Sequence, residues 1–279
     1  MKNVDLANMS AFLNTHMRYG IEQMKAAPKD MVLYNATPWC HPFLYEQEMP
    51  RVLQDAQAAC ALYITKNEKN ASTISRHIEL RADELVANPL PTAPGDVLAG
   101  TQALLLYQII RVLDGDVRRE RLRADAAMDR LESYTHALRP LVDVEDDSSV
   151  LLTFYPTASS MSFWKSWIFR QSLCRTLIAC FYFLSIYHVL KENFAYCDAQ
   201  KALSSLWAAS AHLWNARSVM EFTTAWKEKK HFPIRDLDLT ELIADARADD
   251  IDSFGKILLV AFMGIDDGRG WFLTRGGAL

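Results

Sequence analysis

FWKSWIFRQSLCRT, residues Phe163–Thr176, is the stretch that decides the fold of this chain. It leads directly into an uncharged and largely apolar run, Thr176–Leu190, so the two together predict one long helix over Ser160–Leu190. The apolar run is shorter than the roughly 20 residues that cross a bilayer, and it contains Ser185 and His188. The pattern therefore predicts a buried helix rather than a membrane span.

The composition also favours a large helical core. Half of the 279 residues are apolar, 23% are charged and only 10 are glycine, so the chain can bury a substantial core with few tight turns. Strand signals are nearly absent, since only Leu151–Tyr155 alternates between apolar and polar residues. The sequence predicts an all-α fold, a single large helical domain of roughly ten helices.

Periodicity, caps and prolines place the predicted helices along the chain. The clearest linker is the proline-rich segment Pro89–Gly95, and the most apolar helix follows it. The predicted helices are Asn8–Ala27 (ending at Pro28), Pro50–Thr65, a helix capped by Ser72 or Thr73 that runs to Ala87, Asp96–Leu113, Arg118–Leu138, Ser160–Leu190, Asp198–Trp214, Val219–Trp226, Thr240–Arg247 and Asp252–Met263.

The charge pattern argues against a free-standing DNA-binding protein. The chain has 30 Lys and Arg against 34 Asp and Glu, a net charge of −4, whereas phosphate binding normally requires a basic excess. One arginine cluster, Arg118–Arg123, is interleaved with and flanked by acidic residues that neutralise it. We therefore expect no direct sequence-specific DNA binding.

Metal, cofactor and secretion signals are missing from the sequence. The five cysteines are dispersed without a C-x-x-C pair, which predicts reduced core thiols and no bound metal; they are Cys40, Cys60, Cys174, Cys180 and Cys197. Charged residues interrupt the N-terminal segment, so it does not read as a signal peptide. We expect no cofactor, no membrane association, and a nuclear or cytoplasmic location.

The sequence contains no complete catalytic motif from which an enzyme activity could be assigned. His77 and Glu79 match half of a zinc deaminase signature, but the cysteine pair that completes it is absent. Cys40 and His41 are adjacent in sequence, which directs their side chains differently, so we expect a core thiol and a polar anchor between two prolines. The catalytic residues are unknown.

If the chain holds a ligand, the sequence gives a small set of candidate pocket residues. Gln171 and Arg175 lie one helical turn apart on an apolar helix, so both can project into the same space. A buried guanidinium must be paired or face a cavity. The remaining candidates are four tryptophans and one histidine: Trp164, Trp167, Trp207, Trp214 and His41.

The segment Asp236–Asp252 alternates acidic and apolar residues. This pattern is typical of acidic activation surfaces, and it is also typical of an amphipathic helix with a solvated acidic face. The sequence favours the second interpretation.

The opening stretch resembles the Trp-x-x-Trp-Ile-x-x-Glu-Ser-x-Arg-Arg-Thr signature of the effector domain of fungal binuclear zinc-cluster transcription regulators. Gln171 stands where the signature has Glu, and Cys174 where it has the first Arg. The matching residues are Trp164, Trp167, Ile168, Ser172, Arg175 and Thr176.

Further stretches resemble other parts of that domain in the same order. They are Thr37–Ala61, Leu206–Trp214 with Glu221–Trp226, and Asp252–Leu259 with the later Trp271. The resemblance implies a helical effector domain over residues 35–279, preceded by a helical extension over residues 1–34. The first cysteine is Cys40, so the sequence predicts no zinc-cluster DNA-binding domain.

The resemblance implies a regulator of transcription, commonly of a secondary-metabolite gene cluster, without its own DNA reader. Its partners would be other proteins or the transcription machinery, and a homodimer remains open. The alternative is a scaffold recruited to bind a small apolar metabolite, or a metal-free cyclase or isomerase that acts by shape and hydrogen bonding. Both alternatives use one fold, so the fold alone does not separate them.

Overall fold

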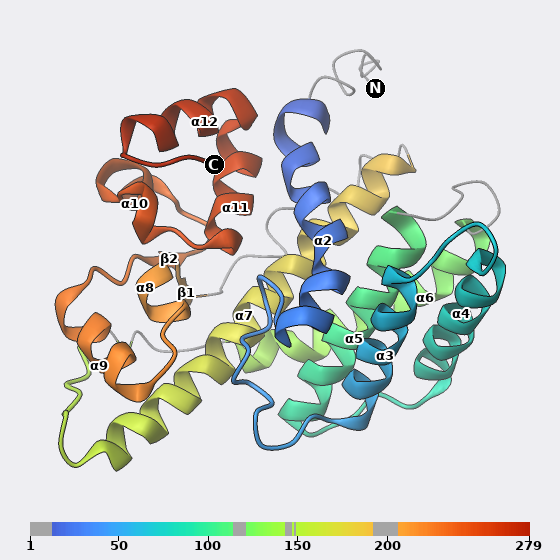
Figure 1. The fold of residues 1–279 in the computed structure, drawn as a ribbon, viewed down its shortest axis with the longest axis horizontal. Helices are drawn as coiled ribbons and strands as arrows, with labels where there is room; N and C mark the ends of the chain where they lie inside the picture. The colour runs from blue at the N-terminus through green and yellow to red at the C-terminus, as the bar shows by residue number, and fades with distance from the viewer. Residues whose placement is uncertain (1–12, 114–120, 143–146, 148, 192–205) are drawn as a thin grey trace. The chain divides into compact units, whose positions relative to one another are not determined.

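Helices α2 to α12 make up most of the chain (Figure 1). The computed structural model describes residues 13–113, 121–142, 147, 149–191 and 206–279. Within these ranges only two short strands pair with each other, so the predicted all-α class is confirmed. Cys197 and, of the arginine cluster, Arg118 and Arg119 lie outside the described residues.

The chain divides into two compact units. Residues Met24–Glu145 and Trp167–Ser205 form what we call the central unit, and Met1–Gln23, Asp146–Ser166 and Leu206–Leu279 form the terminal unit. Each unit is described by itself below. The predicted division of the chain at residues 34 and 35 stays a prediction.

Helix α5, Pro94–Leu113, is the core of the central unit. Every residue from Val97 to Arg111 is buried, as its uniformly apolar sequence predicts. The helices that pack against it are α3, Arg51–Ile64, α4, Ala71–Ala87, and α6, Arg121–Leu138 (Figure 1). A helix that is apolar on all sides needs this covering, because each exposed side would leave apolar surface in water.

The predicted signature helix is present as α7, Thr157–Leu190, and begins three residues earlier than expected. Its residues up to Ser166 belong to the terminal unit, and those from Trp167 belong to the central unit. From Leu173 to Cys180 every residue is buried. This run explains the apolar sequence that follows the signature.

Helices α5 and α7 are long and apolar enough to cross a membrane by length and composition alone. Their most apolar windows are 83% and 72% buried, which is the pattern of core helices. The structure thus accounts for their apolar character by packing.

The terminal unit carries short elements around a buried aromatic and aliphatic core. Strand β1, Leu206–Ala208, pairs antiparallel with β2, Pro233–Arg235, with Trp207 opposite Ile234. The helices are α8, Ala211–Trp214, α9, Val219–Glu228, α10, Thr240–Asp245, α11, Ser253–Met263, and α12, Ile265–Thr274, with the π-helix η1, Leu13–Met17, and the 3₁₀ turn η5, Ala248–Asp250. Helix α11 packs against α12 and η1.

The ends of these short helices are fixed by side chains and by glycine. The Ser218 hydroxyl accepts from the backbone N–H of Glu221 at 3.2 Å, and the Asp252 carboxylate accepts from Gly255 N–H at 2.8 Å. Gly264 joins α11 to α12 with φ 87°, a left-handed conformation that favours glycine.

The first predicted helix, Asn8–Ala27, differs from the observed helix α2, Arg18–Tyr34, at its C-terminal end. We expected an end at Pro28, but Pro28 lies inside α2. Proline in a helix interior costs roughly 3 kcal/mol, yet the neighbouring Met24, Ala27 and Met31 are fully or almost fully buried. Burial of this stripe outweighs the lost backbone hydrogen bond.

Two further predictions about elements were wrong in their details. Asn70, rather than Ser72 or Thr73, precedes α4. The alternating segment Leu151–Tyr155 forms no strand, in keeping with the predicted all-α class. The described part of the predicted helix Asp198–Trp214 is instead β1 followed by the single turn α8. Strand β2 and helix α12 were not predicted, because each is a short segment whose conformation depends on the residues that pack against it.

Close packing between α5 and α6 gives a test of the central unit. A Cβ added at Gly100 would lie 2.7 Å from Cε1 of the Tyr134 ring, so Gly100→Ala should lower the free energy of unfolding by about 1–3 kcal/mol. At exposed Gly270 in α12 an added Cβ meets nothing within 4 Å, so Gly270→Ala should raise stability by about 0.5–1 kcal/mol. Chemical denaturation followed by circular dichroism measures both. Equal effects of the two substitutions would contradict this packing.

Candidate functional site

The seven candidate pocket residues are divided between the two units. Gln171, Arg175, Trp167 and His41 belong to the central unit, whereas Trp164, Trp207 and Trp214 belong to the terminal unit. All seven are buried. The structure thus groups them into two sets, and each set is considered separately.

In the central unit, α7 holds the loop that precedes α3. The Arg175 side chain is 0% exposed, and its Nη1 donates to the carbonyl oxygen of Pro38 at 3.4 Å. One residue further on, the Thr176 hydroxyl donates to the carbonyl of Trp39, also at 3.4 Å. Two adjacent signature residues therefore bind two adjacent backbone carbonyls.

A buried chain of hydrogen bonds extends this contact to α5. The Tyr45 hydroxyl donates to Gln102 Oε1 at 2.9 Å, and Gln102 Nε2 donates to Thr176 Oγ1 at 3.0 Å. Gln102 and Thr176 are both fully or almost fully buried. Because buried polar groups need partners, this chain fixes the loop, α5 and α7 in one arrangement.

The loop itself is tightly organised and gives no catalytic pair. The backbone N–H groups of Thr37 and Cys40 each bond the other residue's carbonyl, and His41 Nδ1 accepts from Phe43 N–H at 3.2 Å. Burial raises the pKa of the Cys40 thiol to about 12, so this thiol is protonated at neutral pH and is a poor nucleophile. By accepting the Phe43 N–H, the His41 ring helps to fix the backbone of this loop.

In the terminal unit the tryptophans pack into aromatic clusters. Trp164 stacks on Phe222 with ring centroids 5.9 Å apart, and Trp207 meets Phe254 edge to face at 5.3 Å. Trp226 joins the first cluster, and its indole N–H donates to the Val150 carbonyl at 2.8 Å. These contacts are those of a packed core.

The acidic segment Asp236–Asp252 is not one continuous helix. It contains α10 and η5, and Asp236 and Leu237 both have positive φ. Leu239 and Leu242 are buried, and Lys230 pairs with Glu241 and Asp245 at 2.7 Å each. Part of the apolar face of the segment therefore belongs to the core, while Leu237 and most of the acids are exposed or half-buried. Asp252 is the exception among the acids, because it is buried where it caps α11.

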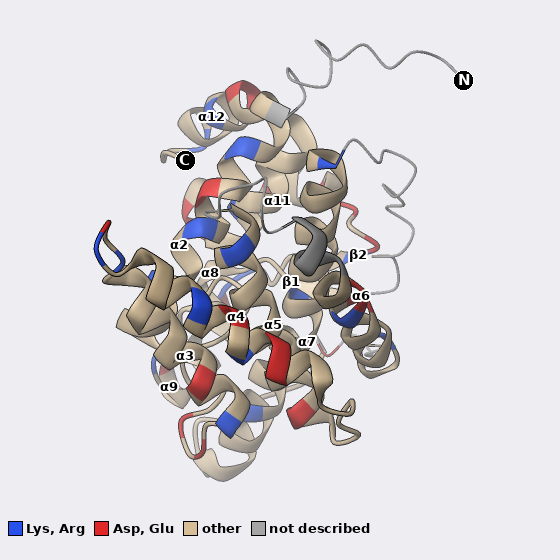
Figure 2. Ribbon diagram, turned by 90° about the vertical axis from the view of Figure 1, so that its right-hand side faces the viewer, with Lys and Arg blue, Asp and Glu red and all other residues tan. Residues whose placement is uncertain are grey.

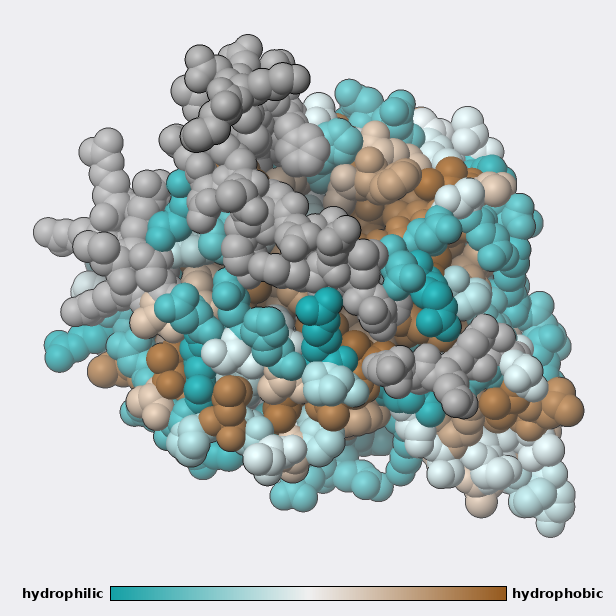
Figure 3. Space-filling view, turned by 180° about the vertical axis from the view of Figure 1, so that it is seen from behind, coloured by the Kyte–Doolittle hydropathy of each residue, from teal (hydrophilic) through white to brown (hydrophobic). Residues whose placement is uncertain are grey.

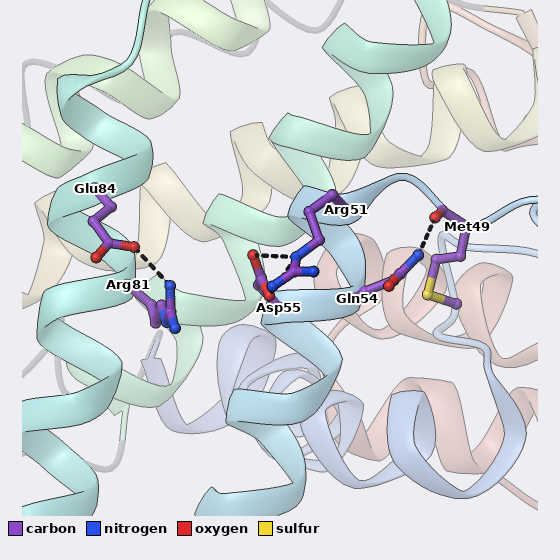
Figure 4. A network of polar contacts seen from close by, with 6 residues as sticks. All are labelled: Met49, Arg51, Gln54, Asp55, Arg81 and Glu84. Carbon is purple, nitrogen blue, oxygen red and sulfur yellow. Dashed lines mark hydrogen bonds and ion pairs between the residues drawn. The ribbon is translucent and has the colours of Figure 1, made fainter.

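A cleft that the sequence did not predict lies between α3, α4 and α5. Its volume is about 270 Å³, and Tyr107 of α5 lines it together with charged residues of the other two helices. On α3, Arg51 Nε contacts the Asp55 carboxylate at 3.1 Å, and on α4, Arg81 Nη1 contacts Glu84 at 2.9 Å (Figure 4). Helical spacing indicates each ion pair in the sequence, but nothing in the sequence indicates that they share a cleft.

Apolar side chains of the described residues are exposed at several places on the surface. On the face shown in Figure 3, hydrophobic residues form several separate patches between hydrophilic ones. The most exposed large apolar side chains are Leu151 and Tyr155, next to α7, and Leu273 on α12. Among the described residues no group of three or more His, Cys, Asp or Glu side chains is placed to hold a metal ion.

Comparison with known proteins gives one informative similarity. The chain is 29% identical over 259 residues to a Penicillium aethiopicum protein named transcription factor gsfR2, an alignment that covers 89% of this chain. It spans 60% of the length of that relative. No protein-family model and no solved structure matches the chain.

The hydrogen-bond chain can be tested with isosteric substitutions. Thr176→Val leaves the Trp39 carbonyl and the Gln102 amide each without a buried partner, so the free energy of unfolding should fall by about 1–3 kcal/mol. The matched control is Thr223→Val in α9, because the buried Thr223 hydroxyl has no partner among the described residues.

Thr223→Val should be neutral or stabilising, since it removes a buried hydroxyl that makes no hydrogen bond. Urea denaturation of both variants makes the comparison. An unchanged midpoint for Thr176→Val would show that this hydroxyl does not hold the loop.

Proposed function

We propose that this chain is the effector body of a transcription regulator and works through protein partners. The observation that carries the proposal is the similarity to a transcription factor along 89% of the chain. That similarity, together with the zinc-cluster effector motifs in the sequence, supports a place in the nucleus and in the control of a fungal secondary-metabolite gene cluster.

The burial of the signature residues supports this proposal. Trp167 and Ile168 are 3% exposed, and Thr176 is 0% exposed. Residues buried in this way specify the fold of the body, so the signature marks a scaffold shared with regulators. The surface that binds protein partners is therefore formed by residues other than these buried signature residues.

The alternative, a small-molecule binder or cyclase at Arg175, requires the guanidinium to face a substrate. Its Nη1 instead donates to the Pro38 carbonyl, and its neighbour Thr176 binds the next carbonyl. These contacts support a structural role for Arg175, and hence the regulator over the enzyme.

The surface charge supports action through proteins rather than through DNA contacts by this chain alone. The net charge is −4. In the view of Figure 2, basic and acidic residues of the described helices are interspersed rather than gathered into a basic stripe. Duplex binding depends mainly on such a stripe.

The regulator proposal predicts an effect on transcription. When the chain is fused to a heterologous DNA-binding module in a fungal host, a reporter under that module's operator should change in activity relative to the module alone. Leu104→Asp places a charge at a fully buried position of α5, so this variant should abolish the effect. Gly270→Ala, at an exposed site, should retain it. A reporter that responds equally to the module alone and to the fusion would overturn the proposal.

The net charge of −4 predicts no sequence-dependent duplex binding by the isolated chain near physiological salt. Fluorescence anisotropy with promoter fragments and shuffled fragments of equal length measures this. Sub-micromolar binding that prefers one sequence would contradict the expectation.

A further inference from the structure

The cleft between α3, α4 and α5 has a floor that is built differently from its rim. Tyr107 of α5 lines it and is 2% exposed. Within the described part of the chain its hydroxyl has no hydrogen-bond partner. The hydroxyl is not among the fully buried polar atoms that lack a partner, so water in the cleft reaches it, and a polar group that enters the cleft can replace that water.

The Tyr107 hydroxyl is a donor at all physiological pH values. Burial raises the pKa of this phenol, and the nearby Asp55 carboxylate raises it further. The proton therefore stays on the oxygen, which can donate to a carboxylate or carbonyl oxygen of a ligand.

The rim carries two positive and two negative side chains. Arg51 and Asp55 come from α3, and Arg81 and Glu84 from α4, so these four charges cancel (Figure 4). The side chain of Arg51 is 80% exposed and that of Glu84 is 61% exposed. Exposed ion pairs are weak because water screens them, so their members can exchange partners at small cost.

The remaining wall is partly apolar, and the polar residue Asn88 completes it. Val52 of α3 and Leu85 of α4 line the cleft beside the charged residues, and Leu85 is buried. At about 270 Å³ the cleft is smaller than the roughly 300–1,000 Å³ of pockets for drug-sized ligands. Its occupant is therefore a small molecule with charged groups of both signs and a short aliphatic part.

We propose that this cleft binds a small zwitterion, an α-amino acid with an aliphatic side chain. The two arginines and the Tyr107 hydroxyl bind its carboxylate, Asp55 and Glu84 bind its ammonium group, and Val52 and Leu85 contact its side chain. A ligand with only one of the two charges leaves half of the rim charges without a new partner, so the cleft selects zwitterions.

Three probes of one carbon skeleton separate these contributions. Isothermal titration calorimetry with the full chain compares L-leucine, 4-methylpentanoate, which lacks the ammonium group, and 3-methylbutylamine, which lacks the carboxylate. L-leucine should bind about tenfold more tightly than either of the others, since each of them lacks the charged hydrogen bonds of one group.

Two substitutions locate the binding. Tyr107→Phe removes only a hydroxyl that the described protein does not use, so the melting temperature should be unchanged while the affinity for L-leucine falls about tenfold. Arg81→Gln should weaken L-leucine binding by a similar factor. The matched control is Arg269→Gln, which removes an exposed arginine three residues from Asp266 in α12 and should bind L-leucine as wild type does.

The proposal is overturned if wild type shows no L-leucine binding at millimolar concentration. It is equally overturned if the two singly charged probes bind as tightly as L-leucine, or if folded Tyr107→Phe and Arg81→Gln retain wild-type affinity. These measurements use the purified chain and do not depend on its action in transcription, so their failure leaves the reporter experiment unaffected.

Discussion

The burial of α5 is the constraint on which the central unit depends. Its residues Val97 to Arg111 have no solvent-facing side, so other helices must cover the whole circumference. Helices α3, α4 and α6 provide much of this cover. Hydrophobic burial is not directional, however, and by itself it does not fix where each covering segment lies.

Hydrogen bonds between buried polar atoms determine where these segments lie. Gln102 on α5 and Thr176 on α7 are buried, and each has a donor and an acceptor to satisfy. The arrangement that satisfies both also positions the loop around Trp39, because Thr176 donates to its carbonyl. A different docking of this loop would leave several buried groups unsatisfied, so a few hydrogen bonds select one packing among many apolar alternatives.

The proposed ligand cleft is a by-product of the same packing. Tyr107 is held on α5, and α3 and α4 cover α5 on both sides of it, so charged residues of two helices meet above one buried phenol. Arg51 and Asp55 look like an ordinary solvated helix pair in the sequence, as do Arg81 and Glu84. These four residues line one cleft only because α5 is buried and helices α3 and α4 must flank it.

Sequence patterns by themselves determined the long elements: the apolar helix α5, the signature helix α7, the amphipathic α3 and the Asp252-capped α11. These elements repeat one period over many residues, and that periodicity survives any tertiary context. They did not determine the helix through Pro28, the pairing of Trp207 with Ile234, or the contact of Arg175 with the Pro38 carbonyl. Short segments have little intrinsic preference, and neighbours distant in sequence decide their conformation. The same reason applies to the cleft, since a sequence records which side chains are charged, while only the tertiary structure decides which of them face one another across a buried hydroxyl.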